Sequence, residues 1–122
     1  PMGYVRSGHK DHGRQNQIEG KMEPGTKVVV IEDLISTGGS VLEVVDVLRQ
    51  AGAQVLGIAS IFTYGLQKGV ERLAAADVVN YSLSDFNTLS KVAAAEGYIA
   101  DKDIAKLTAF QKNPQNPAWM KL

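Results

Sequence analysis

The stretch VVVIEDLISTGGS, residues 28–40, decides the fold of this chain. It begins with four β-branched apolar residues, Val28 to Ile31, which predict a buried parallel strand. Two acids, Glu32 and Asp33, end that strand, and a turn rich in serine, threonine and glycine runs from Leu34 to Ser40. This order predicts the start of a strand–helix–strand unit.

The rest of that unit follows toward the C-terminus. Apolar residues recur at i, i+3, i+4 and i+7 from Val41 to Leu48, which is the period of a buried helix face. Gly52 is placed to end this helix, and the apolar run Val55 to Phe62 predicts a second buried strand. Residues 28–62 therefore form a predicted right-handed crossover unit.

The pattern then repeats more weakly. Ser84 is predicted to cap a helix that Gly97 ends. Its apolar side chains share one face and are expected to point inward: Phe86, Leu89, Val92 and Ala93. The other predicted elements are a helix over 69–76, a strand over 78–81, and a last helix that starts at Asp101 or Asp103 with Ile104, Leu107 and Phe110 inward.

Alternating strands and helices predict an α/β fold, a doubly wound and mainly parallel sheet. We expect an α/β core over 28–112, and a tail over 113–122 because two prolines prevent the helix from continuing. Residues 1–27 are punctuated by glycine and carry no regular period, which suits either a functional lid or a mobile terminal tail. Three strands are few, so an apolar flank should be exposed and further strands should come from elsewhere.

Composition excludes several function classes. The chain has 122 residues, with 13 Lys and Arg against 13 Asp and Glu, and this zero net charge argues against binding nucleic acid or a membrane surface. There is no cysteine, which removes disulfides, thiolate zinc sites and cysteine nucleophiles and suits a reducing compartment. No apolar run approaches the roughly 20 residues of a membrane span.

The chemistry is expected at the carboxyl ends of the strands, where open α/β sheets bind ligands. The glycines of the turn after Asp33 let a ligand approach the backbone, and the N-terminus of the following helix attracts an anion such as phosphate. Two carboxylates beside a phosphate site suit a polyhydroxylated or metal-bound group. A sugar phosphate would therefore suit both the carboxylates and the phosphate site. The alternative is that the turn only caps the helix. Nucleotide-binding loops of the types G-x-x-x-x-G-K-[ST] and G-x-G-x-x-G are absent.

Residues 28–40 as a whole resemble the phosphoribosyl pyrophosphate (PRPP) motif of type I phosphoribosyltransferases. The resemblance extends from about Tyr4 to about Phe110 and covers only the C-terminal portion of the orotate phosphoribosyltransferase family. We therefore expect a sheet of this kind that is truncated at its N-terminus. The flanking segments that resemble this family are Tyr4–Arg6, Lys10–Gly13 and Asn16–Gly20 in its mobile catalytic loop, and Ile61–Tyr64.

The resemblance implies a role for each matching residue. The acids would contact the ribose hydroxyls, the turn would cradle the 5′-phosphate, and Ser36 would also reach orotate. Arg6, Lys10 and His12 would be catalytic, holding the leaving pyrophosphate across a dimer interface. Tyr64 stands where some relatives carry an arginine, and we interpret it as a packing residue. The implied PRPP-binding residues are Glu32, Asp33, Leu34, Ile35, Ser36, Thr37, Gly38, Gly39 and Ser40.

The resemblance also implies an activity. The enzyme would transfer the phosphoribosyl group of PRPP to orotate, giving orotidine 5′-monophosphate and pyrophosphate in pyrimidine biosynthesis. It would use Mg²⁺ bound mainly through the pyrophosphate, and it would be a cytoplasmic homodimer with a shared active site. The alternatives are a PRPP-binding module without catalysis, or a phosphoribosyltransferase for another base. The shortened chain is not expected to be active by itself.

Overall fold

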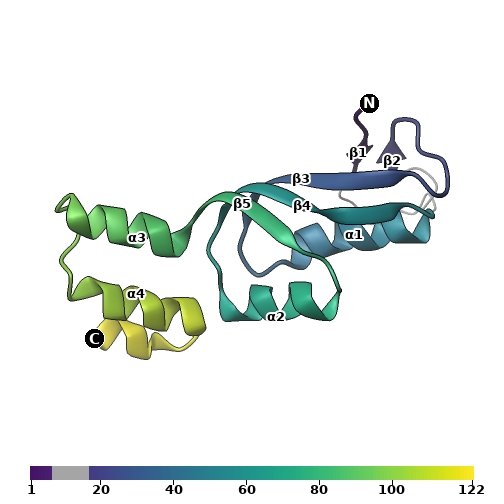
Figure 1. The fold of residues 1–122 in the computed structure, drawn as a ribbon. Coiled ribbons are helices and arrows are strands. Elements are labelled where there is room, and N and C mark those ends of the chain that lie inside the picture. The colour runs from purple at the N-terminus through teal and green to yellow at the C-terminus, as the bar shows by residue number, and fades with distance from the viewer. Residues whose placement is uncertain (7–16) are drawn as a thin grey trace.

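The computed structural model of the protein describes residues 1–6 and 17–122. Its centre is a parallel sheet in the order β3-β4-β5, formed by β3 (Lys27–Ile35), β4 (Gln54–Thr63) and β5 (Asn80–Asp85) (Figure 1). The α/β fold class and the parallel pairing predicted from the sequence are confirmed. Every connection between these strands contains a helix, as parallel neighbours require.

Helices α1 (Gly39–Gln50) and α2 (Gln67–Ala75) lie on the same face of this sheet (Figure 1). The predicted apolar face of α1 is the one that is buried, because Val41, Val45 and Leu48 all point into the core. They pack in one cluster with the apolar side chains of β3 and β4. This packing fixes the start of α1 at the carboxyl end of β3, where the site was predicted.

The end of α1 also follows the prediction. Gly52 has a left-handed backbone with φ of 92°. Its N–H donates to the Arg49 carbonyl at 3.0 Å, and the Ala53 N–H donates to the Leu48 carbonyl at 3.0 Å. These are the two bonds of a Schellman motif, which a glycine at this position allows at little steric cost.

The boundaries of two strands, β3 and β5, were predicted wrongly. Glu32 and Asp33 do not end β3, because Leu34 and Ile35 still pair with β4. The third strand begins at Asn80 rather than at residue 78 and ends at Asp85 rather than at Tyr81. The Val78 N–H belongs to the end of α2 instead, donating to Leu73.

The C-terminal third leaves the sheet as a pair of helices, α3 (Phe86–Ala95) and α4 (Asp103–Lys112) (Figure 1). Asp85, and not Ser84, caps α3, because its carboxylate accepts from the Thr88 N–H at 2.8 Å. Ser84 is still part of β5 and pairs with Phe62. The predicted inward face of α3 was also wrong at two positions, since Leu89 and Val92 are exposed.

A row of aromatic rings joins this helical pair to the sheet. Tyr64, just after β4, contacts Phe62 and Phe86, and its carbonyl accepts from Gln111 Nε2 at 2.9 Å. Phe86 in turn contacts Phe110 of α4 at a centroid distance of 6.0 Å. Tyr64 is therefore a packing residue, as predicted.

Residues 113–122 end in a short 3-10 helix, η2 (Pro117–Lys121). α4 stops at Lys112, just before the two prolines. Trp119 stands edge-on against Phe110 at 5.2 Å and donates its indole N–H to the Pro114 carbonyl at 3.4 Å. Pairing with α4 thus orders a segment in which the sequence predicts only a tail.

At the N-terminal side, β1 (Tyr4–Val5) and β2 (Ile18–Glu19) form a two-stranded antiparallel ribbon. Val5 and Ile18 pack against the edge of the core. The ribbon lies by the amino end of β3, opposite the end that leads into α1 (Figure 1).

The face of the sheet opposite α1 and α2 carries exposed apolar side chains, as the small number of strands predicts. Ile31 is 77% exposed, Tyr81 70% and Leu83 86%. Within residues 1–6 and 17–122, no helix covers this face (Figure 1). In the same described part of the chain, no helix is both long and apolar enough to cross a membrane.

Candidate sugar-phosphate site

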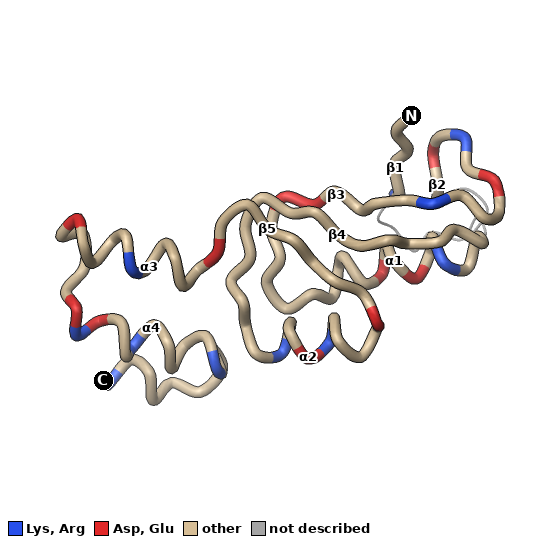
Figure 2. The backbone as a smooth tube through the Cα atoms, in the orientation of Figure 1, with Lys and Arg blue, Asp and Glu red and all other residues tan. Residues whose placement is uncertain are grey.

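The candidate site begins with the two acids of β3. Glu32 is half-buried, Asp33 is exposed, and they are the only acids in this strand. They form the red segment of β3 in Figure 2, near the end of the strand that leads to α1. Because both lie within a paired strand, their backbone positions are fixed by β4 rather than by a free loop.

The two carboxyl groups differ in their ionisation. Partial burial, together with the neighbouring Asp33, raises the pKa of Glu32. The hydrogen bond with Glu32 and the one from the Leu34 N–H, at 2.7 Å, lower the pKa of Asp33. A hydrogen bond to the charged form of a carboxyl favours that form. Asp33 is therefore the better-ionised acceptor of the pair, and it is exposed to incoming ligands.

The turn after β3 leaves the N-terminus of α1 without a side-chain cap. Ser36 and Thr37 are exposed, and Gly38 is buried with φ of 82° as the N-cap residue of α1. A glycine here accepts the left-handed backbone and supplies no capping side chain, so no side-chain hydrogen bond closes the N-terminus of α1. The first N–H groups of a helix without a cap, with the positive end of its dipole, attract phosphate.

Helix α2 lies directly behind this turn. A Cβ atom at Gly69 would lie only 2.7 Å from the Ser36 carbonyl oxygen, so α2 can approach this closely only with glycine there. Arg72 Nη1 donates to the Thr37 carbonyl at 3.3 Å. The sequence alone predicted a role in the site for neither Gly69 nor Arg72. A glycine inside a helical pattern was the one available signal.

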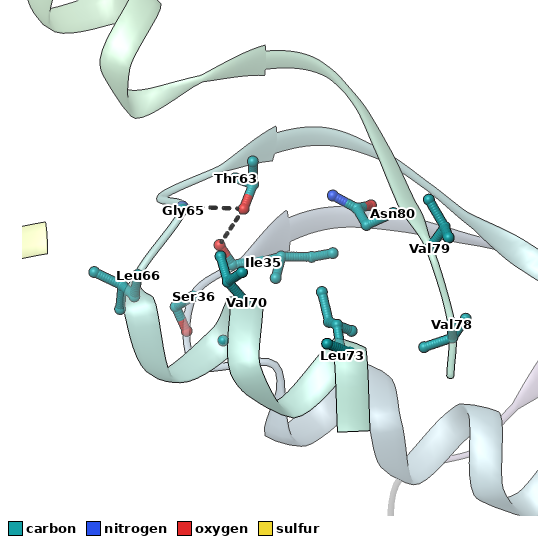
Figure 3. A pocket seen from close by; sticks show the side chains of 12 residues that line it. Ile35, Ser36, Thr63, Gly65, Leu66, Val70, Leu73, Val78, Val79 and Asn80 are labelled. Atoms are coloured by element: carbon teal, nitrogen blue, oxygen red, sulfur yellow. Dashed lines mark hydrogen bonds between the residues drawn. The ribbon is translucent and has the colours of Figure 1, made fainter. Parts of the chain in front are cut away.

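Thr63 ties the turn to β4. Its hydroxyl group accepts from the Gly65 N–H at 3.2 Å and donates to the Ile35 carbonyl at 3.5 Å (Figure 3). The Tyr64 N–H donates to the same Ile35 carbonyl at 3.0 Å. The residue just before Ser36 is thus held by the end of the neighbouring strand.

A cavity of about 380 Å³ lies between α2 and the sheet, with Ser36 at one side (Figure 3). It is lined by Leu66, the N-cap residue of α2, and Val70 and Leu73 of α2, together with Ile35 and Val78. The lining is mostly apolar, so this cavity does not itself offer the charges that a sugar phosphate needs.

Of the predicted cationic residues, Arg6 is not brought to the acids of its own chain. Arg6 pairs with Glu19 across the β1–β2 ribbon, and both side chains are more than half exposed. That ribbon lies by the opposite end of β3 (Figure 1). Lys10 and His12 lie outside the described residues.

The donor set can be tested against Mg²⁺. Among the described residues, no three His, Cys, Asp or Glu side chains gather into a group that could hold a metal ion. The acid pair offers two carboxylates, and Mg²⁺ is commonly held by one or two carboxylates together with substrate phosphates. The residues therefore fit an ion that arrives on a phosphorylated substrate, and they do not form a metal cage of their own.

Comparison with known proteins defines the class of protein. A family model described as a phosphoribosyl transferase domain matches residues 3–93, which include the acid pair, the turn and α2. The chain belongs to the phosphoribosyltransferase family.

Particular relatives narrow this further. An orotate phosphoribosyltransferase of Bacillus cereus is 59% identical over 120 residues, covering 98% of this chain and 57% of the relative. The solved orotate phosphoribosyltransferase of Aeropyrum pernix has a TM-score of 0.66 at 32% identity and covers 82% of this chain and 54% of that one. The enzyme of Mycobacterium tuberculosis in complex with PRPP has a TM-score of 0.52 at 29% identity, over 57% of this chain and 41% of that one. The chain thus spans little more than half the length of the Bacillus relative.

Proposed function

We propose that this chain is the PRPP-binding part of an orotate phosphoribosyltransferase. The observation that carries the proposal is the acid pair Glu32–Asp33 near the carboxyl end of β3, where the strand leads into a turn with glycines and an uncapped helix. The names of the curated relatives and the PRPP complex of a structural relative support the choice of substrates.

In this proposal each part of the site has one task. Asp33 and Glu32 accept hydrogen bonds from the ribose hydroxyls, and residues 36–40 bind the 5′-phosphate through backbone N–H groups and hydroxyls. The orotate nitrogen attacks the anomeric carbon of PRPP and releases its proton to the departing pyrophosphate or to solvent, while the bond from that carbon to pyrophosphate breaks and the leaving group takes the electron pair. Positioning of the reactants and electrostatic stabilisation supply the catalysis. Ser36 is the candidate contact with orotate.

Mg²⁺ is part of the proposal as the counter-ion of the pyrophosphate, whose growing negative charge it would neutralise. Glu32 and Asp33 are the described residues that could reach its coordination sphere. Arg6, Lys10 and His12 are proposed to hold the pyrophosphate from a second copy of the chain. The position of the β1–β2 ribbon, away from the acids of the same chain, supports this sharing (Figure 1). The absence of cysteine supports a cytoplasmic location.

The proposal is tested by calorimetric titration of the chain with Mg·PRPP, orotidine 5′-monophosphate and orotidine. The two nucleoside ligands differ only by the phosphate, so binding of the monophosphate without binding of orotidine would assign the turn to the phosphate. Failure of the folded chain to bind either phosphorylated ligand would contradict the proposal. Binding of PRPP by a full-length enzyme rebuilt from a relative's remaining sequence, with no transfer to orotate, would favour the non-catalytic alternative.

Asp33→Asn provides the matched variant. It should weaken Mg·PRPP binding by at least about tenfold, the lower limit for losing a hydrogen bond to a charged group. Asp101→Asn removes one negative charge from the exposed α3–α4 connection and serves as the control. Equal affinities of the two variants would overturn the assignment of Asp33 to the ribose.

A further inference from the structure

Helix α2 touches the turn 36–39, the proposed phosphate turn, at two places. Gly69 places its Cα against the turn, as shown by the 2.7 Å separation that a Cβ there would have from the Ser36 carbonyl. Arg72, one helical turn later, donates to the Thr37 carbonyl at 3.3 Å. The apolar side chain of Leu73 packs separately against the core cluster.

Each contact acts on the direction of a backbone group. The Thr37 carbonyl accepts a hydrogen bond from Arg72 and therefore points toward α2. The peptide N–H on the other side of the same Thr37 carbonyl carbon, that of Gly38, is then directed oppositely, because the peptide unit is planar and trans. The guanidinium also stands beside Gly39, since a Cβ atom there would lie 3.6 Å from Arg72 Nη1. Its positive charge therefore adds to the positive end of the α1 dipole.

We propose that Arg72 and Gly69 are positioning residues that hold the turn 36–39 in the shape that receives the 5′-phosphate. The inference rests on the proposed function for the identity of the ligand. It extends the site from β3 and α1 to α2, an element outside the PRPP motif. Arg72 acts through the Thr37 carbonyl and contacts no reacting atom.

A second arginine provides a matched control. Arg49 of α1 also donates to backbone carbonyls, those of Ala76 at 2.6 Å and Asp77 at 3.0 Å. It fastens the C-terminal end of α2, whereas Arg72 reaches the phosphate turn. Arg72→Met and Arg49→Met therefore remove the same kind of bond from two places, only one of which is the turn.

The first measurement is amide hydrogen exchange in the unliganded chain, which needs no ligand. In Arg72→Met the amides of Leu42 and Tyr64, which donate to the carbonyls of Gly38 at 3.1 Å and Ile35 at 3.0 Å on either side of the turn, should exchange at least about tenfold faster than in the parent chain, because a held turn opens more often once its tie is lost. In Arg49→Met their exchange should stay unchanged. Unchanged exchange in Arg72→Met would overturn the inference whether or not the chain binds PRPP.

The second measurement is the affinity for Mg·PRPP and for inorganic phosphate, by calorimetry. Arg72→Met should lose about tenfold for both, and Arg72→Lys, which keeps a charged donor, should recover most of that loss. Gly69→Ala should lose affinity although alanine favours a helix more than glycine does, since its Cβ would push against Ser36. An equal loss in Arg49→Met, or no loss in Arg72→Met, would overturn the inference. A parent chain that binds neither ligand would instead contradict the proposed function, while the exchange result would still decide the role of Arg72.

Discussion

Two adjacent carboxyl groups in one strand differ in how readily they ionise. Glu32 faces partial burial and holds its proton more tightly, while Asp33 is exposed and is kept charged by its hydrogen bonds. The arrangement leaves an ionised acceptor at the edge of the site. It also places two like charges one residue apart, an unfavourable feature that a ligand's hydroxyls or cations would relieve.

Glu32→Gln should therefore change stability in a pH-dependent way. A raised pKa means that the folded state binds the proton more tightly than the unfolded state. The contribution of Glu32 to stability is then fully present below its ordinary pKa of 4.5 and is lost as the pH rises through the raised value. Glutamine keeps the oxygen that accepts from the Asp33 N–H and has no charge to desolvate. The variant should be more stable than the parent at pH 7, and this advantage should disappear below pH 4.5.

Urea unfolding of both proteins at several pH values measures this difference. Glu43→Gln, which removes an exposed carboxylate from α1, is the control for a general charge effect. A stability advantage that stays constant down to low pH would contradict the explanation. The same Glu32→Gln variant should bind PRPP more weakly, as expected where function is maintained at a cost in stability.

Asp77 is a non-glycine residue in a backbone conformation that its side chain makes unfavourable. It connects α2 to β5 with φ of 52°, a left-handed conformation that glycine adopts more easily. Asp77→Gly should raise the free energy of unfolding by roughly 0.5–1 kcal/mol, the steric gain less the entropy that glycine adds to the unfolded chain. The Arg49 bond accepted by the Asp77 carbonyl needs no side chain and should persist. Equal or lower stability in urea unfolding would show that the side chain contributes there.

At the scale of elements, glycines end two helices by the same motif in different surroundings. Gly52 after α1 and Gly97 after α3 both have a left-handed backbone, with φ of 92° and 82°. A Cβ at Gly52 would lie 3.0 Å from Cβ of Pro24, whereas at Gly97 nothing lies within 4 Å. Gly97→Ala should therefore lose only the conformational cost, about 1–2 kcal/mol. Gly52→Ala should lose more, and urea unfolding of the two variants compares them directly; a larger loss at Gly97 would contradict this reasoning.

The same elements show how far the sequence could predict the fold. The ends of α1 and α3 were predicted correctly because a glycine in the left-handed conformation is a local signal. The cap of α3 was not, because Ser84 and Asp85 are both good capping residues, and the choice depends on how far β5 pairs with β4. The predicted boundaries of β3 and β5 were wrong for the same reason, because the length of a strand is set by a partner strand far away in sequence.

The candidate site could likewise be predicted from the sequence only where its residues are contiguous. The acids and the turn are contiguous in sequence, and the order of strand, acids and glycines is itself the signal. Arg72 contacts the turn from 35 residues further along the chain, so its contact depends on how α2 docks. The positions of Lys10 and His12, outside the described residues, stay predictions.

At the scale of the whole molecule, one face of the sheet is covered and the other carries exposed apolar residues. Ile31 and Leu83 are 77% and 86% exposed on neighbouring parts of that bare face, and Tyr81 is exposed between them. Contiguous apolar surface of this kind is uncommon on a monomeric protein and favours association. The relatives, of which this chain spans about 57%, have more chain with which to cover a sheet.

The chain by itself should therefore associate through the bare face, and charge placed there should prevent it. Sedimentation of the parent chain should show a weight-average mass that rises with concentration, while the double variant Ile31→Lys and Leu83→Lys should stay closer to 13.1 kDa. Because both side chains are exposed, the substitutions remove little buried contact and should change the unfolding free energy by no more than about 0.5 kcal/mol each. Leu89→Lys and Val92→Lys, exposed on α3 away from the sheet, add the same charge and should leave the association unchanged. If the α3 variant also became monomeric, net charge rather than the bare sheet face would control association; a parent chain that is monomeric at every concentration would show that this face does not drive association.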